Sequence, residues 1–374
     1  MGNELNLRSS RTVVAREATY NTDQIAVDIA ADSAMRYEAF TDVAVTMNGD
    51  FRERNITRPN YGNNRGRYSP RNLGWTVNGI IPAPATAGNA PLGLDNWFVG
   101  AGFTETLVAS TTSTYERPAG VALDQAGLTV YHWLQHKEDY TWRLIYGTGI
   151  RNNLTFAASA REYATWTATG ESANFPVDST VTSDPHGWSL DQAFFGNFTA
   201  GAGLILDKDG VDISVGYVGT ETTDDPRGLI LETDSIITVN AVPYPISAFS
   251  IDLGNTITVK ERTSSTSTVG PVCIVDAAPT LELTLDRSGA GFEDAVDALH
   301  AQREASATLV LSDGLSTGGT RLTITVPDLQ IRDVAGPNDA AGTAAWTIPC
   351  QANTDWPTNQ GGGSDITFVW SVTP

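Results

Sequence analysis

The stretch TDVAVTM, residues 41–47, alternates its side chains with a period of two. In an extended strand this period places Val43, Val45 and Met47 on one face, where they can pack against a core. The pattern predicts a mainly β protein built from antiparallel sheet. Similar runs separated by turn residues follow at 73–80, 128–134, 140–147, 153–159, 163–170, 204–219, 235–240, 248–262, 279–286, 307–313, 321–333, 344–350 and 366–372.

Two segments have a helical pattern instead. Residues 93–103 form a short, glycine-rich candidate, and residues 291–304 form a longer one. The longer segment places Phe292, Val296 and Leu299 on one face and carries acids in its first turn, where the helix dipole favours negative charge. We therefore expect a helix flanking the strands in each half of the chain.

The composition is that of a folded, acidic protein. Of its 374 residues 41% are hydrophobic and 18% charged, and the formal net charge is −20. This composition can bury a core and excludes an intrinsically disordered chain. No run approaches the roughly 18 apolar residues of a membrane-spanning helix, and the start lacks a signal-peptide pattern. We expect synthesis in a cytoplasm, no membrane insertion, and two small buried thiols at Cys273 and Cys350, whose spacing fits no zinc or redox motif.

The order of predicted elements occurs twice along the chain, although the matching residues are sparse. Gly49 corresponds to Gly254 (254 − 49 = 205), and Trp166 corresponds to Trp346 (346 − 166 = 180). Such a repeat indicates two tandem β units, and accidental similarity of two β-rich halves is the alternative. The predicted organisation is a first β unit (1–172), a connector with an extra hairpin (173–235) and a second β unit (236–374).

Residues typical of catalysis are scattered. The histidines His132, His136, His186 and His300 lie at no known spacing from a serine, cysteine or carboxylate that could act with them. DKDGVD (207–212) lacks the terminal glutamate and flanking helices of a calcium loop and is better explained as a hairpin turn. We therefore expect no enzyme, no cofactor and no metal site.

FRERNITRPNYGNNRGRYSPR (51–71) concentrates positive charge in an otherwise acidic chain. It has six arginines and one acid (6 − 1 = +5), so the remaining residues sum to −20 − 5 = −25. The segment has three interpretations: a solvated loop, a nucleic-acid patch opposed by the charge of the rest, or a docking segment for acidic groups on another copy. The candidate contact residues are Arg52, Arg54, Arg58, Arg65, Arg67 and Arg71.

Taken in order, several motifs resemble the tail tube proteins of long-tailed, siphovirus-type bacteriophages. The resemblance runs from about residue 11 to the end and is weakest at 173–235. No single motif is diagnostic, because the specificity lies in their order. The motifs are RTVVAREATYNTD (11–23), RNITRPNYG (54–62), WFVGAGFTET (97–106), STYERPAG (113–120), YPISAFSIDLGNTI (244–257) and APTLELTLD (278–286).

This resemblance implies two tail-tube-type β-sandwich or barrel units, each with a flanking helix. It implies a structural protein of the virion tail, assembled in the host cytoplasm, whose copies form rings that stack into a tube. Two units in one chain imply a trimeric ring with pseudo-sixfold symmetry, with a hexamer as the alternative. The implied partners are further copies of the chain, the tape measure, terminator and distal tail proteins, and phage DNA that passes through the lumen without specific binding.

Within this picture we expect residues 51–71 to reach the adjacent ring and meet acidic groups there. We also expect the acidic excess to give a negative lumen that repels phosphate within the Debye length of about 8 Å. The main alternative function is a carbohydrate-binding β module of a phage adhesin, and a secreted β-sandwich hydrolase is a third. An adhesin requires exposed tryptophan clusters, whereas Trp75, Trp133, Trp142 and Trp166 lie in strand patterns typical of a core.

Overall fold

The computed structural model describes residues 5–22, 24–25, 40–48, 51–52, 67–68, 72–84, 88–91, 93–117, 127–136, 142–172, 228–232, 234–239, 242–261, 269–286, 297, 304–315, 319–340, 343–353 and 365–372. Nearly all of their elements are strands, which confirms the predicted mainly β fold. The elements are β1 (Leu5–Arg16), β2 (Asp42–Asn48), β3 (Phe51–Arg52), β4 (Arg67–Tyr68), β5 (Asn72–Ile80), α2 (Asp95–Gly100), β6 (Thr104–Val108), β7 (Thr112–Glu116), β8 (Leu128–His136), β9 (Trp142–Ser159), β10 (Thr165–Glu171), β11 (Ile230–Leu231), β12 (Ile236–Val239), β13 (Val242–Asp252), β14 (Asn255–Glu261), β15 (Val269–Ala277), β16 (Thr280–Asp286), β17 (Glu304–Ser312), β18 (Thr320–Ile331), β19 (Ala335–Ala340), β20 (Thr343–Ala352) and β21 (Thr367–Val372).

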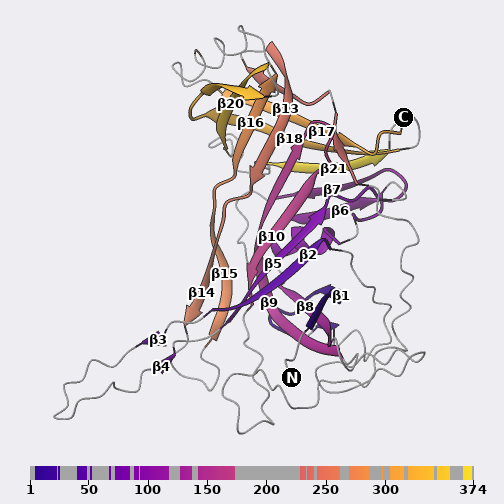
Figure 1. Cartoon of the computed structure of the whole chain (residues 1–374), viewed down its shortest axis with the longest axis vertical. Helices are drawn as coiled ribbons and strands as arrows, with labels where there is room; N and C mark the ends of the chain where they lie inside the picture. Colours follow the sequence, from indigo (N-terminus) through magenta and orange to yellow (C-terminus); the bar gives the residue numbers. More distant parts are fainter. Residues whose placement is uncertain are drawn as a thin grey trace, which may run out of the picture.

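Among the described strands, six close into a barrel in the upper part of the molecule (Figure 1). The antiparallel pairs are β12 with β13, β13 with β16, β16 with β20, β20 with β18, β18 with β17, and β17 with β12. Alternate residues point into the barrel, as Leu281, Leu283 and Leu285 of β16 do, and all three are buried. Closure pairs the backbone groups around the barrel, so its strands support one another.

Six other strands form an open sheet below the barrel. Their antiparallel order is β2-β5-β10-β9-β8-β1. The end of β9, Thr155–Ser159, also pairs with Ala248–Asp252 of β13, which is a barrel strand. The open sheet and the barrel are therefore parts of one hydrogen-bonded structure, and β9 runs between them (Figure 1).

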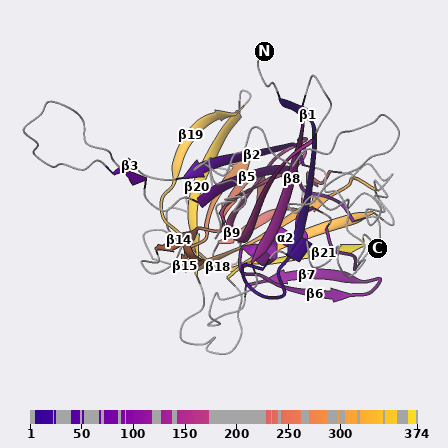
Figure 2. The same ribbon diagram turned by 90° about the horizontal axis from the view of Figure 1, so that it is seen from below.

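A third set of strands interlocks the two ends of the chain. The C-terminal strand β21 pairs with β18 of the barrel on one side and with β7 on the other, and β7 pairs with β6. Seen from below, β6, β7 and β21 lie together near α2 (Figure 2). The fully buried Phe98 of α2 stacks on Tyr115 of β7 at 4.7 Å between ring centroids and contacts Phe368 of β21 at 4.8 Å. Aromatic burial of this kind stabilises the junction.

Several sequence predictions are confirmed at the level of single elements. β5, β8, β10, β16, β18, β20 and β21 lie within a residue or two of the predicted runs, and α2 forms inside the shorter predicted helix. Trp75 and Trp166 are buried as expected. The side chains of Trp133 and Trp142 lie outside the described residues, as do 204–219 and most of the longer predicted helix, of which Asp297 is helical.

Two predictions of strand boundaries are wrong. The run 248–262 is not one strand, because β13 ends at Asp252 and β14 begins at Asn255, with Gly254 at a φ of 63° between them. The runs 140–147 and 153–159 are not separate strands. They belong to the single strand β9. The register on β8 shifts between Leu128, opposite Ile150, and Val130, opposite Gly147, so the glycine-rich stretch is a β-bulge inside the strand. Gly149 has a φ of 61°, and a Cβ on Gly147 would lie 2.8 Å from Nε1 of Trp75. The glycines therefore bend the strand rather than end it.

Candidate assembly surfaces

The arginine-rich segment 51–71 is a hairpin at its base. Phe51 and Arg52 of β3 pair antiparallel with Tyr68 and Arg67 of β4, which form a two-stranded sheet of their own. In this ladder Arg52 lies opposite Arg67. The structure thus places two of the six candidate residues on one ribbon, whereas Arg54, Arg58, Arg65 and Arg71 lie outside the described residues.

A second hairpin occupies the same place in the second half of the chain. β14 and β15 pair antiparallel and run along β9 away from the barrel (Figure 1). Val272 and Ile274 of β15 are buried, whereas Val275 is 54% exposed. Tyr20 holds this hairpin to the body, because its hydroxyl accepts a hydrogen bond from the Val272 amide (2.6 Å) and donates to the Gly149 carbonyl oxygen (3.2 Å).

The open sheet and the barrel share one order of pairing. The order β1-β8-β9-β10-β5-β2 of the open sheet has its counterpart in β12-β17-β18-β20-β16-β13 of the barrel, and every pair is antiparallel. In each set one hairpin outside the sheet is inserted between two of its strands: β3–β4 lies in the sequence between β2 and β5, and β14–β15 lies between β13 and β16. The sets differ in closure: β12 pairs with β13, whereas no described residue of β1 pairs with β2.

The registers agree as well as the order. Val43 pairs with Val77 and Phe249 pairs with Leu283, and both shifts are equal (249 − 43 = 206; 283 − 77 = 206). Val77 also pairs with Ala168, and Leu283 with Ile348, a shift of 348 − 168 = 180. The shift of 180 equals the sequence distance between Trp166 and Trp346. The distance between Gly49 and Gly254 is 205, one residue less than the register shift of 206.

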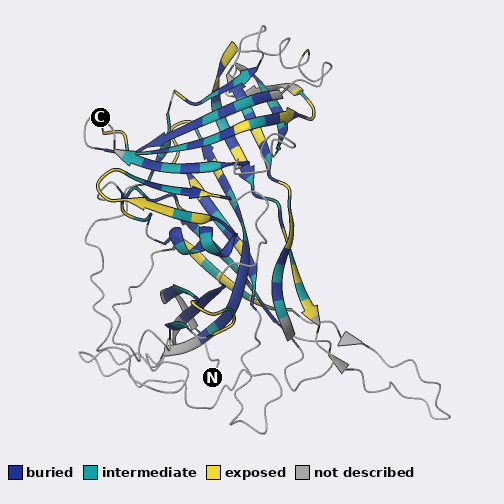
Figure 3. Cartoon of the chain, turned by 180° about the vertical axis from the view of Figure 1, so that it is seen from behind, coloured by how far each residue is buried: buried dark blue, intermediate teal, exposed yellow. Residues whose placement is uncertain are grey.

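Several strands, β1, β2, β6 and β19 among them, have a free edge, meaning an edge with no pairing in the described part of the chain. β2 pairs there with β5 alone, and β19 pairs there with β20 alone. Of these, β6 also has exposed side chains: Leu107 and Val108 are each 48% exposed, and the strand is largely exposed in Figure 3. A free strand edge without lysine can accept another strand, and neither β2 nor β19 carries one.

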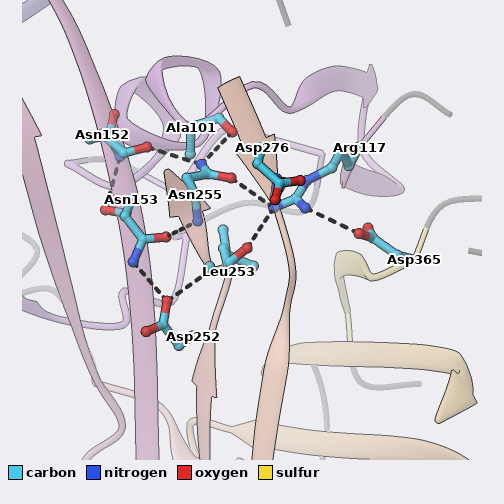
Figure 4. A network of polar contacts seen from close by, with 11 residues as sticks. Ala101, Arg117, Asn152, Asn153, Asp252, Leu253, Asn255, Asp276 and Asp365 are labelled. Atoms are coloured by element: carbon cyan, nitrogen blue, oxygen red, sulfur yellow. Dashed lines mark hydrogen bonds and ion pairs between the residues drawn. The ribbon is translucent and has the colours of Figure 1, made fainter. Parts of the chain in front are cut away.

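A buried polar network ties the second hairpin to the helix and to both sheets (Figure 4). Asn255, the first residue of β14, donates through Nδ2 to the carbonyl oxygens of Ala101 (3.0 Å) and Asn152 (3.1 Å). Its amide donates to Oδ1 of Asn153 (3.0 Å), whose Nδ2 donates to Asp252 (2.7 Å). Satisfied groups of this kind define one arrangement of the strands, since any shift leaves a buried polar atom unpaired.

The same network contains a buried ion pair. Arg117 donates to Asp365 (3.1 Å), to the Leu253 carbonyl oxygen (3.3 Å) and to Oδ1 of Asn255 (3.3 Å). The side chains of Arg117 and Asp365 are 7% and 5% exposed. Burial raises the pKa of Asp365, and the neighbouring guanidinium acts in the opposite direction. Because both groups are enclosed, the pair can position strands but cannot meet a substrate.

A second buried carboxylate organises the start of the chain. Glu17 is 1% exposed and accepts hydrogen bonds from the amides of Gly149 (2.6 Å) and Asn21 (2.6 Å) and from the Thr129 hydroxyl (3.0 Å). Burial raises its pKa, whereas these donors and the charge of Arg151 oppose the increase. The contacts fix the bulge of β9 and thereby the segment that carries Tyr20.

The described histidine and cysteine side chains lie in the interior or at its margin. His132 is buried, shares a 2.8 Å hydrogen bond between its Nδ1 and the Thr12 hydroxyl, and has a pKa lowered to about 4 because of burial. Both thiols are free; Cys350 is buried as predicted, whereas Cys273 is only half-buried. Within the described ranges, no group of three or more His, Cys, Asp and Glu could hold a metal ion.

No protein-family model matches the chain, and no curated protein matches it. Of the helices in the described residues, none is long and apolar enough to cross a membrane. The candidate assembly surfaces among the described residues are the two outlying hairpins and the free edges.

Proposed function

We propose that this protein is the structural subunit of a bacteriophage tail tube, which assembles from copies of the chain as stacked rings. The observation that carries the proposal is the shared pairing order of two sets of six strands, one closed and one open. A chain with two sets of strands in one pairing order, and with a free edge at β2 in the first set and at β19 in the second, is suited to a ring in which the two sets alternate. The trimer with pseudo-sixfold symmetry follows as the proposed ring, with the hexamer as the alternative.

Stacking of rings is assigned in this proposal to the hairpin 51–71. Ring-to-ring contacts are heterologous and do not close, so they build a tube of open length. One exposed ion pair contributes about 0–1 kcal/mol, so the arginines act together and set orientation more than affinity. The genome passes through the lumen, where the acidic excess of the chain limits adhesion of DNA.

Negative-stain microscopy and mass measurement of the purified protein test the proposal. Rings or tubes, with a ring mass of three chains, are the expected result. Dispersed single chains at assembly concentrations would contradict it. Tight binding of DNA by assembled tubes at moderate salt would contradict the non-adhesive lumen alone.

A charge-reversal variant tests the stacking hairpin separately. Arg58→Glu, Arg65→Glu and Arg67→Glu combined should give rings that do not polymerise, whereas the matched Lys triple variant keeps the charge and should still form short tubes. Tubes of normal length from the Glu variant would remove the hairpin from the proposal.

The adhesin alternative is not favoured by the described side chains. Of the tryptophans whose burial the structure describes, Trp75, Trp97, Trp166 and Trp370 are buried and Trp346 is half-buried. A sugar platform needs exposed aromatic faces.

A further inference from the structure

The chain contains its own example of how two units join edge to edge. Ser159 of β9 lies opposite Ala248 of β13, and the ladder continues to Thr155 opposite Asp252. β9 belongs to the open sheet and β13 to the barrel, so this ladder connects one set of six strands with the other. On β13 it occupies the side next to β12, which pairs with the preceding residues, Val242–Pro245.

The counterpart of the end of β9 in the second set is β19. Thr155 pairs with Thr167 and Ala335 pairs with Thr347, and both shifts are 180 (335 − 155; 347 − 167). Beyond a one-residue irregularity in the pairing of β19, Ala157 corresponds to Asn338, because their partners, Thr165 and Ala345, also differ by 180. β19 therefore stands in the second set where the joining end of β9 stands in the first.

The counterpart of β13 in the first set is β2, at the shift of 206 derived from their pairs with β16 and β5. The counterparts of β2 and β19, which are β13 and the end of β9, pair with each other within the chain. In the described residues β2 and β19 themselves each have a free edge instead. In Figure 1, β20, which carries β19, lies at the upper end of the molecule, whereas β2 lies near its middle. These two edges do not pair within one copy.

We propose that β19 of one copy pairs antiparallel with β2 of the next copy, in the register of β9 on β13. The inference rests on the proposed ring and identifies the strands that close it. In this register Thr46 lies opposite Ala335, Ala44 opposite Asn338, and Asp42 opposite Ala340 of the neighbouring copy. The contact is a main-chain ladder of the kind that adds one strand to another sheet.

The residues of both strands suit this ladder. β19 has the sequence AGPNDA, so its side chains are small, and neither strand carries a lysine that would block an edge. Pro337 removes one amide donor, which leaves the ladder short and dependent on the correct register. If the pairing of β9 with β13 is repeated between copies as β19 with β2, each unit is rotated relative to the next in the same way. An equal rotation at every contact is the condition for a closed ring.

Disulfide trapping between copies tests the pairing. In a Cys273→Ser background, which removes the half-buried thiol and retains buried Cys350, Thr46→Cys and Ala335→Cys are combined in one chain. Directly opposite residues of an antiparallel pair have Cα atoms about 4.5–5.5 Å apart, within the range of a disulfide. Mild oxidation should link most copies into covalent rings, seen as multimers on a non-reducing gel. Ala44→Cys with Asn338→Cys is the second pair and should behave alike.

The control combines Thr46→Cys with Thr106→Cys on β6, another strand with a free edge, and should stay largely monomeric on the gel. Rings by microscopy without a Thr46–Ala335 or Ala44–Asn338 crosslink would overturn the strand assignment and leave the tube proposal standing. Crosslinking of the β6 control would assign the joint to β6 instead. Absence of rings and of crosslinks would overturn both proposals.

Discussion

Arg117 donates to Asp365 across 248 residues of sequence, at 3.1 Å and with both side chains almost fully buried. Arg117 follows β7, and Asp365 precedes β21, so the ion pair joins the two strands near the point where they pair with one another. The early and late parts of the chain are thereby held by one contact that water does not reach.

Asp365→Asn should lower the free energy of unfolding by about 3–5 kcal/mol, because the guanidinium of Arg117 is left buried without its counter-charge. Urea unfolding measures the loss. The matched control is Asp234→Asn, which removes the exposed ion pair of Asp234 and Arg321, with side chains 69% and 34% exposed, and should change stability by at most about 1 kcal/mol. Equal losses in the two variants would contradict the structural role of the buried pair.

Glu17→Gln should destabilise the protein by about 2 kcal/mol. Both carboxylate oxygens accept from backbone amides, so either orientation of the glutamine amide turns its NH₂ toward an N–H donor. Chemical denaturation measures the change against Glu162→Gln, an exposed carboxylate that accepts from the Ser159 hydroxyl and should shift stability by about 0.5 kcal/mol or less. A neutral Glu17→Gln would mean that water or another group replaces these bonds.

Gly254→Ala should be clearly more damaging than Gly314→Ala. Both glycines have positive φ, 63° and 77°, which costs an alanine about 1–2 kcal/mol. A Cβ on Gly254 would also lie 2.1 Å from the Ala278 carbonyl oxygen, whereas nothing lies within 4 Å of one on Gly314. The additional overpacking should cost about 1–3 kcal/mol, measured as the difference between the two unfolding free energies. Similar values would show that the base of the β14–β15 hairpin can relax.

Stability should fall between pH 6.5 and pH 4 through His132. Its folded pKa of about 4 lies below the unfolded value of about 6.5, so the unfolded state binds the proton first as the pH falls. The contribution is present above pH 6.5 and decreases by about 3 kcal/mol down to pH 4. His132→Asn can keep a hydrogen bond to Thr12 without titrating, so its unfolding free energy should depend less on pH in this window. Parallel pH profiles for both proteins would contradict the assignment.

The alternating runs determined the fold class and the positions of many strands, because period-two burial is a local property of each strand. For example, Trp75 lies opposite Val45 and Trp166 lies opposite Phe156 on neighbouring strands, and all four residues belong to alternating runs. β6 and β7 escaped prediction because threonine-rich TETLV and TSTYE carry little apolar contrast. β19, with AGPNDA, reads as a turn, and it became a strand because β20 offers it a pairing edge.

The sequence by itself also predicted a repeat, through the shift of 180 between Trp166 and Trp346, and it placed a concentration of positive charge in 51–71. Only the tertiary structure decided that one set of six strands closes while the other remains open, and that Thr155 meets Asp252 at the joint. Pairing partners depend on which edges meet in space, and no local pattern encodes that choice. For the same reason, the sequence did not indicate that β2 and β19 each have a free edge.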